Sequence, residues 1–259
     1  MDFATPIGIF VAFMAIMLDS VMSGGSPAAL IAPSSMLLVF GGTIGVSLAG
    51  VLLKDAGSLA KALKVAILTK ATSGDAAIGQ LVALAETARR EGLLALEAAA
   101  GEITDPFFRQ GVEMAVDGTD PEQIREVLER EIDSMRARHR LAAKFFADMG
   151  GFAPTIGILG TVLGLVHVLS HLSTPDKLGP LIGDAFTATL WGVLSANVMW
   201  IPIANKLKRV SEREARNREL VMDGILAIQA GSNPRMLEQQ LLTYLAPKDR
   251  ETAKRSRAA

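Results

Sequence analysis

Cysteine is absent from the 259 residues of this chain, and aromatic residues make up only 5% of them. Without cysteine the chain can form no disulfide, no thiolate metal site and no thiol nucleophile. No nucleophile, base and orienting acid occur together in a motif, so we expect no enzyme. Basic residues are also absent from the first 53 positions, because the first Lys or Arg is Lys54.

What the sequence has instead is four long apolar stretches. They cover residues 6–22, 32–53, 151–172 and 185–204. Each has about the 17 to 25 residues that a helix needs to cross a hydrocarbon core, and soluble core helices are seldom so long and so free of charge. The sequence therefore predicts an all-α integral membrane protein with four transmembrane helices.

The positions of Lys and Arg predict the orientation of these helices. The connection at residues 23–31 has no charge, and the connection at residues 173–184 has Lys177 as its only basic residue. All other Lys and Arg fall in residues 54–150 or 206–259. Because cytoplasmic loops carry the excess of basic residues, both regions and both termini are expected on the cytoplasmic side.

This pattern divides the chain into four predicted segments. They are an outer hairpin of two transmembrane helices (1–53), a cytoplasmic helical domain (54–150), a second transmembrane hairpin (151–205) and a helical cytoplasmic extension with a basic tail (206–259). Asp120 as N-cap and Pro121 at the first helical position predict a helix start. No helix breaker follows until Gly150, so this helix is expected to run into the third span. Gly92 is expected to interrupt the helical region that precedes Pro121.

Small residues repeat along one face of the third and of the fourth span. They are Pro154, Gly157, Gly160, Thr161 and Gly164 in the third, and Ala185, Thr189, Gly192 and Ala196 in the fourth. Such faces let membrane helices approach closely, which is the simplest interpretation of the glycines. The hydroxyls of Thr161 and Thr189 could instead ligate a cation, or bond back to their own helix. Pro154 has no N–H, so the carbonyl one turn earlier in the helix is left without its usual hydrogen-bond donor.

A carboxylate at membrane depth is missing from this picture. Ion relays usually need one, yet Asp19 and Asp184 lie near the outer ends of their spans. We therefore expect any titrating acid to come from the helix of a partner. His167 and His171 are four residues apart, but two ligands are too few for a metal site.

Charged side chains in the cytoplasmic segment are candidates for a protein contact. Arg89, Arg90 and Glu97 lie beside an Ala/Leu-rich helical region. Arg90 and Glu97 share a face if the helix continues through Gly92. Most such charges are a solvated surface, and the alternative role is to orient a charged partner.

At this point the sequence resembles a known family. The matching stretches are FAPTIGILGTVLGL at residues 152–165, ATLWG at 188–192, IPIANKL at 201–207, and MDGILAIQ at 222–229 with NPR at 233–235. They resemble the A subunits of the bacterial flagellar motor stator, the MotA/PomA proteins of the wider MotA/TolQ/ExbB group. The resemblance runs nearly from end to end.

The resemblance implies a homopentamer around two copies of a MotB/PomB-type subunit that supplies the membrane aspartate. Ion flow across the bacterial inner membrane would turn the ring of A subunits, and the third and fourth spans would line the central space. Arg89, Arg90 and Glu97 match residues that contact the rotor protein FliG, and Pro154 and Pro202 match two functional prolines. Membrane lipid is expected as a further partner, and nucleic acid is not.

The resemblance also bears on the transported ion, for which no tightly bound cofactor is expected. Sodium-driven members are similar to this chain in having Thr161 and Thr189, which favours Na⁺ over H⁺. Two residues depart from the sodium-type pattern, Ala188 where a second threonine is common and Gly151 where an acid is common. The alternative function is a TolQ/ExbB-like energiser of envelope processes, although that class usually has three spans.

Overall fold

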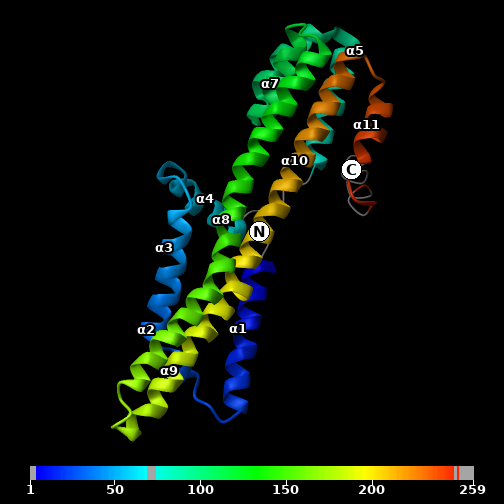
Figure 1. The fold of residues 1–259 in the computed structure, drawn as a ribbon. Helices are drawn as coiled ribbons and strands as arrows, with labels where there is room; N and C mark the ends of the chain where they lie inside the picture. The colour runs from blue at the N-terminus through cyan, green and yellow to red at the C-terminus, as the bar shows by residue number, and fades with distance from the viewer. Residues whose placement is uncertain (1–3, 69–73, 248–249, 251–259) are drawn as a thin grey trace. The chain divides into compact units, whose positions relative to one another are not determined.

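The computed structural model describes residues 4–68, 74–247 and 250, and these are almost entirely helical, with no strand among them (Figure 1). The all-α prediction is confirmed. Two compact units divide the chain, the first from residues 1–71 and 139–210, the second from residues 72–138 and 211–259. The long helices α8 (Pro121–Leu169) and α10 (Ile201–Gln229) each contribute one part to each unit.

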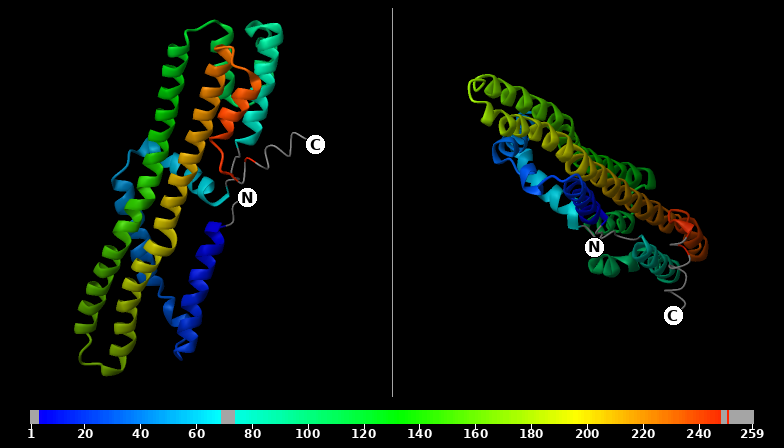
Figure 2. Two further views of the ribbon diagram at one scale, coloured as in Figure 1. Left: turned by 90° about the vertical axis from the view of Figure 1, so that its right-hand side faces the viewer. Right: turned by 90° about the horizontal axis from the view of Figure 1, so that it is seen from below.

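The first unit contains the apolar helices. They are α1 (Ala4–Met22), the 3₁₀ turn η1 (Pro27–Leu30), α2 (Pro33–Met36), the π-helical segment η2 (Leu37–Gly41), α3 (Gly42–Ala49), α4 (Leu53–Leu68), the later part of α8, α9 (Pro175–Leu194), the π-helical segment η4 (Ser195–Trp200) and the start of α10. Four stretches among the described residues are long and apolar enough to cross a membrane. Figures 1 and 2 show α8 and α9 running side by side as a hairpin.

The helix that begins at Pro121 confirms the sequence prediction most fully. The Asp120 carboxylate accepts a hydrogen bond from the backbone N–H of Glu122 at 2.9 Å, as a helix-capping side chain does. From there α8 continues for 49 residues. It passes through Gly150 and Pro154 without a break, so the last part of the segment at residues 54–150 and the third span are one helix.

The largest differences from the predicted span boundaries are at the end of the second span and the start of the fourth. Regular helix in the second span ends at Ala49 rather than at residue 53. The fourth span begins ten residues earlier than predicted, because α9 starts with Pro175 at its first position and tolerates Pro180 inside it. The expected connection at residues 173–184 is therefore mostly helical.

A π-helical turn interrupts the fourth span just before a proline. Segment η4 ends at Trp200, two residues before Pro202. Proline has no N–H for the carbonyl four residues earlier, and its ring clashes with that carbonyl. A widened turn is one way to accommodate both effects, and such turns are frequent at functional sites.

The second unit is a bundle with a core of large side chains. Its elements are α5 (Asp75–Glu91), the 3₁₀ turn η3 (Leu93–Ala95), α6 (Leu96–Glu102), α7 (Pro106–Val116), the start of α8, the end of α10, and α11 (Pro234–Leu242). Phe107, Phe108 and Ile225 are at most 2% exposed in this core. Gly92 separates α5 from η3 at a φ of +88°, a conformation that favours glycine.

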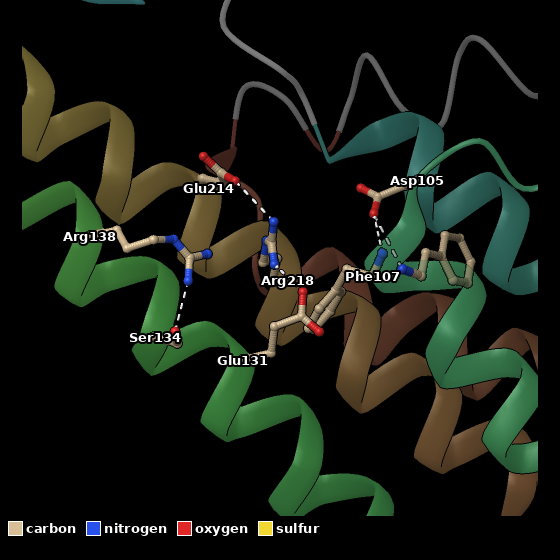
Figure 3. Close-up of polar contacts among 8 residues, drawn as sticks. Asp105, Phe107, Glu131, Ser134, Arg138, Glu214 and Arg218 are labelled. Atoms are coloured by element: carbon tan, nitrogen blue, oxygen red, sulfur yellow. Dashed lines mark hydrogen bonds and ion pairs between the residues drawn. The ribbon is translucent and has the colours of Figure 1, made fainter. Parts of the chain in front are cut away.

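Charged side chains join three helices at the edge of this core (Figure 3). The Arg218 guanidinium lies 3.0 Å from Glu131 and 3.3 Å from Glu214, and 4.9 Å above the ring of Phe107. Arg138 donates to the Ser134 hydroxyl at 2.8 Å. Because Arg218 is mostly buried, its two carboxylate partners and the ring offset the cost of removing its charge from water.

Candidate ion-pathway site

Helices α8 and α9 approach each other closely in the first unit. A side-chain carbon placed on Gly157 would lie 2.9 Å from the carbonyl oxygen of Ala188 and 3.1 Å from the Cα of Gly192. One placed on Gly192 would lie 2.7 Å from the Ala153 carbonyl oxygen. These neighbours are backbone atoms, which cannot move aside. Only glycine therefore fits at either position, as is common where membrane helices touch.

The contact between small residues continues along the hairpin. The position of a Cβ on Gly160 lies 2.7 Å from the Cβ of Ala188, and that on Gly164 lies 2.6 Å from the Cβ of Ala185. The small faces predicted for the third and fourth spans thus pack against each other within one chain. Close packing accounts for these glycines.

Both predicted threonines lie at this contact, and their hydroxyls bond to each other. The Thr161 hydroxyl also lies 2.9 Å from the carbonyl oxygen of Ala185 and 3.3 Å from that of Gly157. The Thr189 hydroxyl lies 3.3 Å from the same Gly157 oxygen. Thr161 therefore bonds to its own helix and also across the hairpin.

Four oxygen atoms meet in this arrangement, which we call the four-oxygen cluster: the hydroxyls of Thr161 and Thr189 and the carbonyls of Gly157 and Ala185. Two hydroxyl hydrogens serve four acceptors, so some acceptor capacity is left over. Carbonyl and hydroxyl oxygens are the ligands that can replace the hydration shell of a hard cation. The cluster can thus bind a hydrogen-bond donor or a small cation.

The two predicted prolines interrupt the backbone hydrogen bonds of this hairpin. Pro154 lies in α8 three residues before Gly157, and Pro202 lies in the first turn of α10. Each removes the usual donor for the carbonyl four residues earlier, that of Gly150 and that of Val198. Both prolines are partly exposed.

The histidine pair forms a local contact only. The rings of His167 and His171 have centroids 4.5 Å apart. The His171 Nδ1 lies 3.0 Å from the His167 carbonyl oxygen and 3.0 Å from the Ser170 hydroxyl. Within the described residues no group of three or more His, Cys, Asp or Glu side chains could hold a metal ion.

Two contacts that sequence reasoning missed tie the first hairpin to α9. The Ser35 hydroxyl donates to the Asp184 carbonyl at 3.0 Å, and the Trp191 indole N–H donates to the Leu30 carbonyl at 2.7 Å. The Trp191 ring also lies 5.8 Å from Phe13 and from Phe40, centroid to centroid. The signal in the sequence was a polar serine and a tryptophan inside apolar spans.

The predicted rotor-contact residues lie on the surface of the second unit. Arg89 and Arg90 are in the last turn of α5 and Glu97 is in the first turn of α6, and all three are exposed. None has an ion pair within the described part of the chain. The condition for Arg90 and Glu97 to share one helix face is not met, because the chain breaks at Gly92 and they belong to different helices.

Comparison with known proteins agrees with this arrangement. The sequence model of the MotA/TolQ/ExbB proton channel family matches residues 99–220. Motility protein A of Bacillus subtilis is 40% identical over 251 residues, which are 96% of this chain and 93% of that protein. The chain belongs to the MotA/TolQ/ExbB family. As a member of this family of channels it is a multi-pass membrane protein and not an enzyme.

Solved structures extend the likeness of this MotA/TolQ/ExbB protein to both units. A chain of the flagellar MotAB stator complex from Bacillus subtilis matches with a TM-score of 0.88 and 40% identity. A chain of C. jejuni MotAB matches with a TM-score of 0.92 and 31% identity. Each match covers 95% of this chain and 97% of the other.

Proposed function

We propose that this chain is the A subunit of a flagellar motor stator, which couples cation flow across the bacterial inner membrane to rotation of a ring of A subunits. The observation that carries the proposal is the match to chains of two MotAB structures over nearly the whole length, cytoplasmic segment included. A likeness confined to the spans would fit a TolQ/ExbB-like energiser equally well.

The absence of a central carboxylate supports the proposed assembly. Five A subunits would surround two MotB/PomB-type subunits, whose aspartate supplies the titrating group that the spans of this chain lack. Residues 54–150 and 206–259 would be cytoplasmic, since they carry nearly all the Lys and Arg. The N-terminus would lie on the same side, because the first two spans form a hairpin that returns to residue 54. The exposed charges at Arg89, Arg90 and Glu97 would contact FliG on the rotor.

Complementation of motility tests this function. In a flagellated strain that lacks its stator A gene, the chain co-expressed with its own B partner should restore swimming. The same pair should not restore the envelope defect of a strain lacking a TolQ or ExbB protein. The reverse result would contradict the motor and support the energiser.

For the transported ion we favour Na⁺ over H⁺, on the strength of the four-oxygen cluster. A sodium ion needs several oxygen ligands in place of its water, and the cluster supplies two hydroxyls and two carbonyls at one contact. A proton needs only the carboxylate of the partner. Thr161, Thr189 and Gly157 contribute to the ion path directly, and Pro154 and Pro202 shape its backbone.

Ion replacement and a matched pair of threonine variants test this choice. Swimming should stop when external sodium is replaced by potassium at constant pH, and unchanged speed would refute sodium. Thr161→Ala should raise the sodium concentration that gives half-maximal speed. Thr155→Ala is the control, because Thr155 lies on the same helix, is exposed and bonds only to the Phe152 carbonyl. Equal shifts in both variants would show that Thr161 only packs.

Charge reversal tests the rotor contact. Arg90→Glu should reduce torque while expression and membrane insertion stay normal, because complementary charges orient the partner. Arg235→Glu is the control, since Arg235 is an exposed arginine of α11 in the same unit. Wild-type torque in the Arg90 variant would show that Arg90 takes no part in the rotor contact.

A further inference from the structure

Two hydroxyls of α3 are buried without a hydrogen-bond partner. Thr43 is 0% exposed and Ser47 is 4% exposed, and neither hydroxyl oxygen has a partner among the residues that the structure describes. A hydroxyl in an apolar helix usually bonds to the carbonyl four residues earlier, as Thr187 does to Gly183 at 2.8 Å. A buried polar group left unsatisfied costs about 1 to 3 kcal/mol.

A third unpartnered group belongs to the indole of Trp200. Trp200 is 9% exposed, and its Nε1–H finds no acceptor in the described part of the chain. The other tryptophan, Trp191, donates its indole N–H to the Leu30 carbonyl at 2.7 Å. Buried tryptophans normally have such a partner.

The Trp200 indole lies in a cluster of buried residues that Phe40 and Val51 pack against. Thr43 and Ser47 are four residues apart in α3 and so share one face of that helix. Phe40 precedes Thr43 at the end of η2, and Val51 lies just beyond the end of α3. The Phe40 and Trp200 ring centroids are 6.3 Å apart. Thr43 and Ser47 lie in the chain between Phe40 and Val51, and both are buried. Other members of the cluster near Trp200 include Ala153, Ala196 and Ala204, whose side chains are short.

The chemistry of the three groups selects their ligand. An indole N–H can only donate, so the ligand must accept a hydrogen bond, and two hydroxyls can both donate and accept. A sodium ion would be repelled by the indole hydrogen, whereas water satisfies all three groups. Buried waters typically make about three hydrogen bonds to polar groups that otherwise have no partner.

We propose that Thr43, Ser47 and Trp200 form a binding site for ordered water between α3 and the π-helical segment η4. This site is separate from the four-oxygen cluster and does not depend on the proposed motor function. The water joins the first hairpin to the π turn that precedes Pro202. Nearer the other end of these hairpins, Ser35 and Trp191 join them by direct hydrogen bonds. The water would have the same role beside Trp200.

The competing explanation is a contact of the Trp200 N–H with the Phe40 ring. The two rings are nearly perpendicular, at 74°, which is compatible with a weak N–H···π interaction. That contact would satisfy the indole without water. It would leave the hydroxyls of Thr43 and Ser47 without a hydrogen-bond partner.

Water-edited solid-state NMR of the full-length chain, labelled with ¹⁵N at the tryptophan indoles and held in lipid bilayers with its B partner, tests the site. Transfer from water should reach the Trp200 Nε1 several-fold faster than the Trp191 Nε1, which is an internal control because it bonds to a carbonyl. The double variant Thr43→Val with Ser47→Ala should lose the fast transfer at Trp200 and leave Trp191 unchanged. Thr43→Ser should retain it.

Slow transfer to both indoles in the wild-type chain would overturn the proposal, and this measurement needs no variant to fold. Fast transfer that survives the double variant would also overturn it, because the hydroxyls would then not hold the water. Slow transfer with a shifted Trp200 resonance in Phe40→Leu would establish the ring contact instead.

Discussion

The two units of this chain pack their helices in opposite ways. Between α8 and α9 the closest approaches are made by Gly157 and Gly192, where any side chain would meet backbone atoms. In the second unit the helices pack through large buried side chains such as Leu81 and Phe107. Burial of apolar area drives association in water, but lipid tails are as apolar as leucine. The contact between α8 and α9 thus depends on backbone approach and hydrogen bonds, and the core of the second unit depends on side-chain volume.

The largest effect should come from removing volume in the second unit. Leu81 is 0% exposed and covers Gly224, whose added Cβ would lie 2.5 Å from a Leu81 methyl. Leu81→Ala should lower the free energy of unfolding of the full-length protein by about 2 to 5 kcal/mol, measured by chemical denaturation. Leu94→Ala is the control, because Leu94 is 74% exposed. Similar losses in both variants would show that the second unit does not depend on volume.

The next effect should come from adding volume in the first unit. Gly157→Ala forces a Cβ to within 2.9 Å of the Ala188 carbonyl oxygen, and overpacking of this kind costs about 1 to 3 kcal/mol. The variant should lower the thermal stability of the protein in lipid and reduce swimming speed. Gly45→Ala on α3 is the control, because nothing lies within 4 Å of its added Cβ. Unchanged thermal stability and swimming speed in Gly157→Ala would show that the α8–α9 contact does not depend on close backbone approach.

The sequence predicted most of the helices because their signals are local. The start at Pro121 and the break at Gly92 each rest on residues next to the boundary. The early start of α9 was missed because Pro180 and Asp176 lower its apolar character and resemble a loop. The π-helical turn before Pro202 was missed because helix-breaking residues in spans can be accommodated in several ways, and neighbouring helices decide which.

Prediction of the site was limited in the same way. Spacing alone placed Thr161 and Thr189 on small faces, and the two faces do meet. Pairs joined by long-range contacts, such as Trp191 with Leu30, could not be predicted, because 161 residues separate the two. The burial of Thr43 also depends on how the first hairpin packs on the second, which no local pattern encodes.

A smaller effect should follow from adding volume in the second unit. A Cβ on Gly111 would lie 2.5 Å from the Ile225 Cδ1 and 3.2 Å from the Leu128 Cδ1. These distances are about as short as those at Gly157. These atoms are the ends of flexible side chains and can rotate away. Gly111→Ala should therefore change the free energy of unfolding by less than about 1 kcal/mol, since alanine also favours the helix by a similar amount. A loss larger than that of Gly157→Ala would contradict the comparison.

The smallest effect concerns a polar contact at the edge of the second unit. Tyr244, the only tyrosine of the chain, donates to the Asp223 carboxylate, and burial and this carboxylate raise the pKa of Tyr244 to about 12. Phenolate absorbance should thus reach half its change near pH 12 rather than near an ordinary value of about 10. In Asp223→Asn it should move toward the ordinary value. Because the raised pKa belongs to the folded state, its contribution to stability is complete below about pH 10 and is lost as the pH rises toward 12. A midpoint near the ordinary value in the unsubstituted chain would show that Tyr244 is not held by Asp223.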